Sequence, residues 1–165
     1  MSEFEKIKPG LSELFLRLDA AAPSDPVLKA AAETWAEHRG SALLPGMSLL
    51  QDLPGFIRPH AFLARILADG RREWMFTDAG ASARVSLGSA SGPVKEMAEP
   101  ALARRLMALF DLVAQKGEPC SGMFELQSEG KQPRLCEVYA APVAPPREGE
   151  AAILAVLNWR TEAMK

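Results

Sequence analysis

A carboxylate and a phenol on one predicted strand are the residues best placed for acid–base chemistry in this sequence. Glu137 and Tyr139 lie two positions apart in residues 134–143, which have strand character, so their side chains would share one face of a sheet. Proton transfer at neutral pH needs an acid with a raised pKa and a hydrogen-bond donor beside it, and Asp78 is the other acid available. However, the pattern around Glu125 and Glu137 is more typical of an exposed, charge-balanced rim.

The histidines and cysteines offer little further chemistry. His38 and His60 are the two histidines, and their spacing does not suit a metal ion. Cys120 and Cys136 fall in predicted strands at positions that should not face each other, so we expect two buried, inert thiols. We expect neither a metal nor a cofactor. Haem and flavin are disfavoured because residues 78–117 contain no histidine or cysteine.

The composition is that of one ordinary globular domain. The chain has 165 residues, of which 48% are hydrophobic and 24% are charged. Its formal net charge of -2 gives no electrostatic attraction for nucleic acid or for an anionic membrane. The first residues lack the apolar stretch of a secretory signal, and two cysteines are typical of a reducing compartment. These features predict a cytoplasmic protein with no nucleic-acid partner and no membrane segment.

Apolar spacing, together with residues that start or end helices, predicts three helices. Apolar residues recur at helical intervals between positions 11 and 18, which predicts a short amphipathic helix near the N-terminus. A second helix is predicted over residues 25–39, with Asp25 as its N-cap and Pro26 at its first position. The third covers residues 100–116, where leucines form an apolar stripe and Gly117 ends the helix.

Five strands are expected in two groups, a hairpin followed later by a three-strand meander. They are predicted at residues 60–67, 73–77, 120–127, 134–143 and 151–159. The last strand is apolar on both faces, which predicts a central position covered on both sides. The helix at residues 25–39, with Trp35, is the candidate for covering the outer face. The small residues from 78 to 92 favour a helical turn followed by a loop.

A pattern of residues links the second helix to the first strand. It consists of Trp35, Arg39, Asp52, Leu53, Pro54, Phe56, Ile57, Pro59 and His60. In this pattern the chain resembles a bacterial single-domain PAS family, whose members have a helix ending in tryptophan and arginine and then an aspartate-leucine-proline turn. The resemblance implies a PAS-like α+β fold, with a five-stranded antiparallel sheet, helices over one face and the N-terminal helices on the outer face. It also implies a sensory or regulatory module.

The leading hypothesis is therefore a sensory domain without catalysis, which binds a small apolar ligand or a signalling protein partner. The ligand would lie between the sheet and the helix at residues 100–116. The expected pocket residues are Phe62, Ile66, Trp74, Phe76, Leu106, Phe110, Phe124 and Tyr139. The alternative is a small cone-shaped α+β enzyme resembling ketosteroid isomerases, which would use Glu137 and Tyr139.

The N-terminal helix is the expected interface of a homodimer. Its apolar face consists of Leu11, Leu14, Phe15 and Leu18. A helix this short is not stable alone and must dock on something, and in related PAS proteins such helices pack against each other across a two-fold axis. The predicted organisation is an amphipathic helix within residues 1–24, a PAS-like domain in residues 25–160 and a polar tail in residues 161–165.

Overall fold

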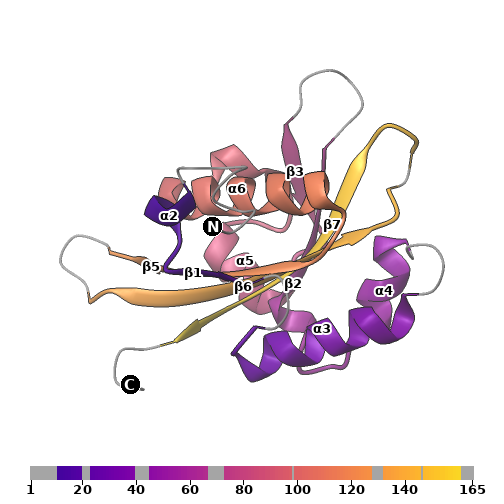
Figure 1. Ribbon diagram of the computed structural model, residues 1–165, viewed down its shortest axis with the longest axis horizontal. Coiled ribbons are helices and arrows are strands. Elements are labelled where there is room, and N and C mark those ends of the chain that lie inside the picture. Colours follow the sequence, from indigo (N-terminus) through magenta and orange to yellow (C-terminus); the bar gives the residue numbers. More distant parts are fainter. Residues whose placement is uncertain are drawn as a thin grey trace.

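The computed structural model shows one antiparallel sheet with helices on both faces (Figure 1). It describes residues 11–19, 23–39, 45–66, 73–97, 99–127, 132–145 and 147–160. The strands are β1 (Arg17–Asp19), β2 (Ala61–Ile66), β3 (Trp74–Thr77), β4 (Gly92–Pro93), β5 (Cys120–Leu126), β6 (Arg134–Val143) and β7 (Ala151–Arg160). The helices are α2 (Leu11–Leu14), α3 (Pro26–His38), α4 (Gly46–Asp52), α5 (Ala81–Leu87) and α6 (Pro100–Lys116), with 3-10 turns η1 (Arg58–His60) and η2 (Val94–Glu96).

In the described part of the chain the sheet has seven strands, in the order β1-β5-β6-β7-β2-β3-β4. The β2–β3 hairpin joins the β5–β6–β7 meander through β2 and β7, where Phe62 lies opposite Ala155. The mixed α+β class with an antiparallel sheet is thus confirmed, and β7 is central as its apolar faces predicted. The expectation of five strands was wrong, because the short strands β1 and β4 extend the two edges.

The N-terminal segment differs from the predicted amphipathic helix. Helix α2 ends at Leu14, whereas Leu18 lies in β1 and pairs with Gly122 of β5. The Phe15 ring lies so close to Gly122 that a Cβ there would be 2.7 Å from it. The helical spacing was misleading because the open edge of β5 offers backbone hydrogen bonds to an adjoining segment. A short isolated helix has little stability of its own, so residues 17–19 pair with β5 instead.

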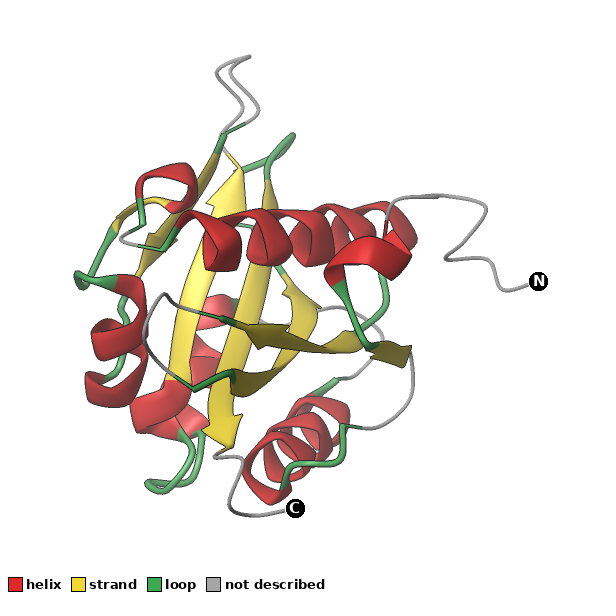
Figure 2. Cartoon of the chain, turned by 90° about the vertical axis from the view of Figure 1, so that its left-hand side faces the viewer, coloured by secondary structure: helices red, strands yellow, loops and turns green. Residues whose placement is uncertain are grey.

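This segment lies on the α6 side of the sheet, so the expectation that it covers the outer face was wrong for α2. Arg105 Nε of α6 donates a hydrogen bond to the Leu14 carbonyl oxygen at 2.9 Å. Phe15 is buried, and its ring meets the Phe124 ring edge-on with centroids 5.8 Å apart. Figure 2 shows α6 crossing the sheet with α2 beside one of its ends.

Helix α6 covers the inner face of the sheet over the predicted bounds, and it ends at Gly117 with φ of 69°. Its apolar stripe is fully buried, as expected for Leu102, Leu106, Leu109, Phe110 and Val113. Helix α5 adds Ala83 and Leu87 to the same core. It packs so closely on η1 that a Cβ at Gly80 would lie 2.3 Å from the Arg58 carbonyl oxygen, which only glycine avoids.

Helices α3 and α4 cover the outer face, as predicted for the helix with Trp35. Asp25 caps α3, since its Oδ1 accepts hydrogen bonds from the N–H groups of Val27 and Leu28 at 2.8 and 3.3 Å. The Trp35 indole N–H donates to the Pro142 carbonyl oxygen of β6 at 2.9 Å. The aspartate-leucine-proline turn follows α4 and buries Leu53 in this outer core.

Several predicted features lie outside the described residues. They are the turns at residues 69–70 and 130–131, the end of the second helix at Gly40, the tail at residues 161–165, and the side chain of Leu11.

Candidate functional site

The inner face, where a ligand pocket was expected, is filled by its own side chains. Phe62 packs edge-on against Phe76 and Phe110, with ring centroids 6.2 and 6.1 Å apart. Trp74 also meets Phe110, at 5.4 Å. Leu106 and Phe124 are buried in the same core cluster. The inner core therefore holds these predicted pocket residues together by direct packing, in the manner of an ordinary protein interior.

Two of the eight predicted residues have other surroundings. Tyr139 lies on the outer face, in the cluster of α3 and α4, because neighbouring residues of a strand alternate between the two faces. Ile66 lies at the margin of the inner core and, with Trp74, lines a polar hollow beside the C-terminal half of α6. The prediction of one pocket containing all eight residues was therefore wrong.

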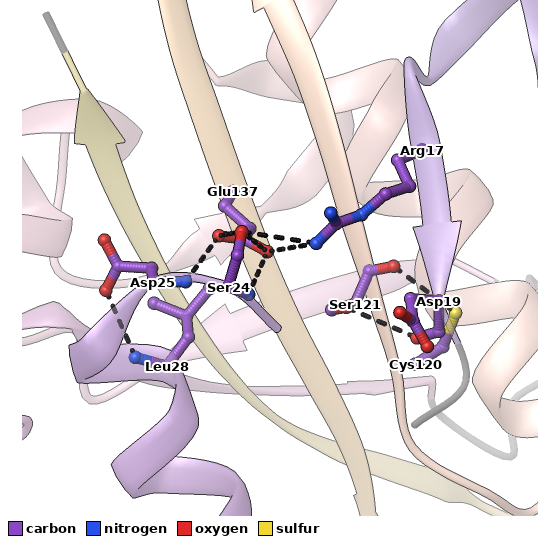
Figure 3. A network of polar contacts seen from close by, with 8 residues as sticks. All are labelled: Arg17, Asp19, Ser24, Asp25, Leu28, Cys120, Ser121 and Glu137. Atoms are coloured by element: carbon purple, nitrogen blue, oxygen red, sulfur yellow. Dashed lines mark hydrogen bonds and ion pairs between the residues drawn. The ribbon is translucent and has the colours of Figure 1, made fainter. Parts of the chain in front are cut away.

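Glu137 of β6 is buried, at 1% exposure, and the prediction that it lies on an exposed rim was wrong. Its carboxylate accepts hydrogen bonds from the backbone N–H groups of Ser24 and Asp25, each at 2.9 Å, and from the Ser24 hydroxyl at 3.1 Å (Figure 3). Arg17 Nη2 of β1 lies 3.5 Å from Oε2. The carboxylate thus joins β6 to the start of α3 and to β1.

These contacts bear on the acid–base alternative. Glu137 and Tyr139 do share one strand face, as predicted, and burial raises the pKa of the Tyr139 hydroxyl. However, the Glu137 oxygens accept hydrogen bonds from the segment that precedes α3, so they face protein donors and not a substrate. This geometry suits a structural anchor, because a general base must reach the proton that it removes.

An open apolar space lies on the outer face of the sheet, and we call it the outer groove. Its volume is about 580 Å³. The walls come from five places in the sequence: the start of α4, the strands β2 and β7, the end of β3 and the end of β6. The lining residues are Pro45, Gly46, Met47, Leu63, Ala64, Arg65, Thr77, Asp78, Val143, Ala144, Pro145, Ala152 and Ile153.

The outer groove is mostly apolar with a few polar groups at its margin. Gly46 approaches the sheet closely, since a Cβ there would lie 3.1 Å from Leu63 and 3.2 Å from Val143. Arg65 and Asp78 supply charges of opposite sign. Asp78 has φ of 57°, the sole positive value for a residue other than glycine in the described ranges, and such backbone strain is often found at functional sites. An apolar space with a few polar groups is typical of a small-molecule site.

The sequence reasoning missed the outer groove. Pro45, Gly46 and Pro145 lie outside the predicted helices and strands, and the predicted pocket included neither these residues nor the outward-facing residues of β2. A local signal did exist, because Leu63 and Arg65 alternate with the inward-facing Phe62 and Ala64. However, no pattern in one segment indicates that five separate segments meet around a space.

The described histidines and cysteines form no reactive group. His38 lies at the end of α3, where Nδ1 is 2.8 Å from the Thr34 carbonyl oxygen and Nε2 is 3.4 Å from Asp52 Oδ2. Cys120 and Cys136 are free and buried, and they lie opposite Ala140 and Phe124, as their predicted separation requires. The described ranges contain no group of three or more histidine, cysteine, aspartate or glutamate residues that could hold a metal ion.

Comparison with known proteins yields limited similarity. No protein-family model matches the chain, and no curated protein matches it. One solved structure that matches is described as an RNA-binding light-oxygen-voltage receptor, with 18% sequence identity and a TM-score of 0.36. The match covers 64% of this chain and 32% of the receptor chain, so this chain spans about a third of that chain's length.

The fold places the chain in a broad structural class. The chain is a mixed α+β protein in which a hairpin, a helical segment and a three-strand meander form one antiparallel sheet. This is the element order that the PAS resemblance implies. None of the helices in the described ranges has the length and the apolar character needed to cross a membrane.

Proposed function

We propose that this chain is a PAS-type regulatory module that acts by binding, with no catalytic step. Its ligand in this proposal is a small apolar molecule, and the binding site is the outer groove. The observation that carries the proposal is the location of the open apolar space: the inner core is closed by aromatic packing, whereas the outer groove provides about 580 Å³.

The position of the outer groove supports a regulatory role. The groove is walled by α4 and by β2 and β7, so an occupant would contact a helix and the centre of the sheet together. A ligand can shift a conformational equilibrium only if it binds the two states with different affinity. A site shared between a helix and a sheet meets this condition, because movement of α4 would change the contacts of the ligand.

The outer groove is tested by following the methyl groups of the protein by NMR while 1-octanol is added. We expect saturable shifts at Leu63 and Val143, which line the groove, and none at Leu106 and Leu112, which lie in the inner core. Native mass spectrometry of the purified protein would show any ligand retained from the cell.

A variant of Thr77 provides the control. Thr77 is half-buried at the end of β3 and lines the groove, so Thr77→Trp should fill the space and remove the response to 1-octanol. Thr77→Val, which keeps the volume, should bind as the unmodified protein does. Shifts at the inner-core methyl groups, or equal binding by Thr77→Trp and Thr77→Val, would rule out the outer groove as the site.

A further inference from the structure

His38 lies between two hydrogen-bond acceptors where the C-terminal ends of α3 and α4 meet. Its Nδ1 atom is 2.8 Å from the Thr34 carbonyl oxygen of its own helix, and its Nε2 atom is 3.4 Å from Oδ2 of Asp52, the last residue of α4. A carbonyl oxygen only accepts hydrogen bonds, so Nδ1 must carry a proton. In the neutral ring Nε2 is then an acceptor that faces a carboxylate. The contact with Asp52 is therefore favourable only when both ring nitrogens are protonated and the ring is positively charged.

Two arginines lie near this contact, and each is engaged elsewhere. Arg39 of α3 lies over the Trp35 ring, with its guanidinium carbon 5.1 Å from the ring centroid. Arg58 of η1 donates a hydrogen bond to the Gln51 carbonyl oxygen and not to a carboxylate. The other acids of α3 are exposed, and they are Glu33 and Glu37. In the described ranges, His38 is thus the cation that pairs with the carboxylate at the end of α4.

Helix α4 carries this contact at one end and a wall of the outer groove at the other. Gly46 and Met47, at its start, line the groove. Gly46 is packed so closely on the sheet that a Cβ there would lie 3.1 Å from Leu63. With seven residues, α4 is about 10 Å long, and so short a helix moves as a rigid unit. A small displacement at Asp52 therefore changes the wall of the outer groove.

We infer that protonation of His38 regulates ligand binding in the outer groove, because the charged ring holds α4 against α3 through Asp52. This inference rests on the proposed function of the groove. Histidine is the side chain whose charge ordinarily changes between about pH 5 and 8. At the lower pH the contact forms and the groove keeps its present shape. As the pH rises the ring loses a proton, the contact is lost, and α4 is no longer held. Since binding and protonation are linked, a ligand that fits this shape also favours the protonated ring.

The contact itself is tested without ligand, by following the backbone amide signal of Gln51 in α4 by NMR between pH 5.5 and 8. We expect this signal to shift with pH in the unmodified protein and not in His38→Gln. In Asp52→Asn the ring still takes up a proton but has no carboxylate to bind, so the shift should be clearly smaller. His60→Gln removes the other histidine of the chain and is the matched control, which should respond as the unmodified protein does.

The effect on the outer groove is measured by titrating 1-octanol at pH 5.5 and at pH 8 and following the methyl groups of Leu63 and Val143. The unmodified protein should bind about two- to fivefold more tightly at pH 5.5, which is the range expected for an ion pair between partly exposed side chains. His38→Gln should bind with the weaker affinity at both pH values. His38→Lys keeps a positive charge at both values and should bind with the tighter affinity at both.

Two results would overturn the inference. The first is an equal pH response of the Gln51 amide in the unmodified protein and in His38→Gln. The second is 1-octanol binding with the same affinity at pH 5.5 and pH 8 in the unmodified protein. Absence of binding at both pH values would instead refute the outer groove as a site, and with it the regulation, while the Gln51 amide still decides whether the contact depends on the proton. Unchanged methyl signals of Leu106 and Leu112 in the inner core verify that each variant is folded.

Discussion

Two polar side chains on the same face of β6 differ in their hydrogen bonding. The Glu137 carboxylate accepts hydrogen bonds from Ser24 and Asp25. The Tyr139 side chain is 2% exposed among the apolar residues of the outer core, and desolvation raises the pKa of its hydroxyl. Within the described residues this hydroxyl forms no hydrogen bond, so the ring accounts for the contribution of Tyr139 to stability.

We expect Tyr139→Phe to leave the free energy of unfolding unchanged within about 1 kcal/mol, or to raise it slightly. The substitution keeps the buried ring and removes a hydroxyl that forms no hydrogen bond within the described residues. Tyr139→Ala should instead cost about 3 to 5 kcal/mol, because it leaves a cavity. Urea denaturation measures both. A loss above about 2 kcal/mol for Tyr139→Phe would indicate a hydrogen bond that the enzyme alternative needs.

Among the secondary-structure elements, Glu137 connects three that are distant in the sequence. Its carboxylate joins β6 to the segment before α3, and Arg17 brings β1 to the same group (Figure 3). Strand β1 in turn protects the edge of β5 and holds Phe15 against the inner core. Self-association of the chain stays a prediction, but the helical face on which it rested is not formed, because Phe15 and Leu18 contact the core of their own subunit.

We expect Glu137→Gln to lower the free energy of unfolding by about 3 kcal/mol, since breaking a buried charged network leaves its partners unsatisfied. The amide group of Gln would also place donors against the N–H groups of Ser24 and Asp25. Urea denaturation measures the loss, and hydrogen exchange should show faster exchange at those two amides.

Glu125→Gln is the matched control, because Glu125 is exposed on the adjacent strand β5. It should change the free energy of unfolding by less than about 0.5 kcal/mol. Equal effects of the two substitutions would mean that the buried hydrogen bonds of Glu137 contribute nothing to stability.

At the scale of the whole molecule, burial affects how stability depends on pH. Desolvation raises the pKa of the Cys120 thiol from 9.0 to about 12, and it raises the pKa of Cys136 further. Unfolding exposes both thiols to water, where they ionise near their ordinary pKa. The folded state therefore retains protons that the unfolded state loses, and its stability must fall as the pH rises above about 9.

We expect this linkage to reduce the free energy of unfolding by about 1.4 kcal/mol for each thiol at pH 10, relative to pH 7. Urea denaturation at the two pH values measures the decrease. The double variant Cys120→Ala, Cys136→Ala should be less stable at pH 7 but should lose correspondingly less between the two values. Identical decreases in the double variant and the unmodified protein would show that the thiols ionise in the folded state.

The sequence alone determined the main helices and strands, because their signals are local. Asp25 and Pro26 start α3 where predicted, Pro100 and Gly117 bound α6, and the five longer strands lie within two residues of their expected positions. The two apolar faces of β7 also determined its central position with helices on both sides. Caps, breakers and apolar periodicity act within a few residues, so one segment is enough to read them.

Only the tertiary structure decided what the segment from Phe15 to Asp19 does, where open space remains, and which polar groups are buried. Residues 17–19 became a strand because the edge of β5 offered hydrogen bonds, and Glu137 is buried because the segment before α3 supplies its donors. The inner core is closed by aromatic rings from several segments, whereas the outer groove and the polar hollow beside the C-terminal half of α6 remain open. These outcomes depend on packing between residues distant in the sequence, and such contacts leave no pattern in any single segment.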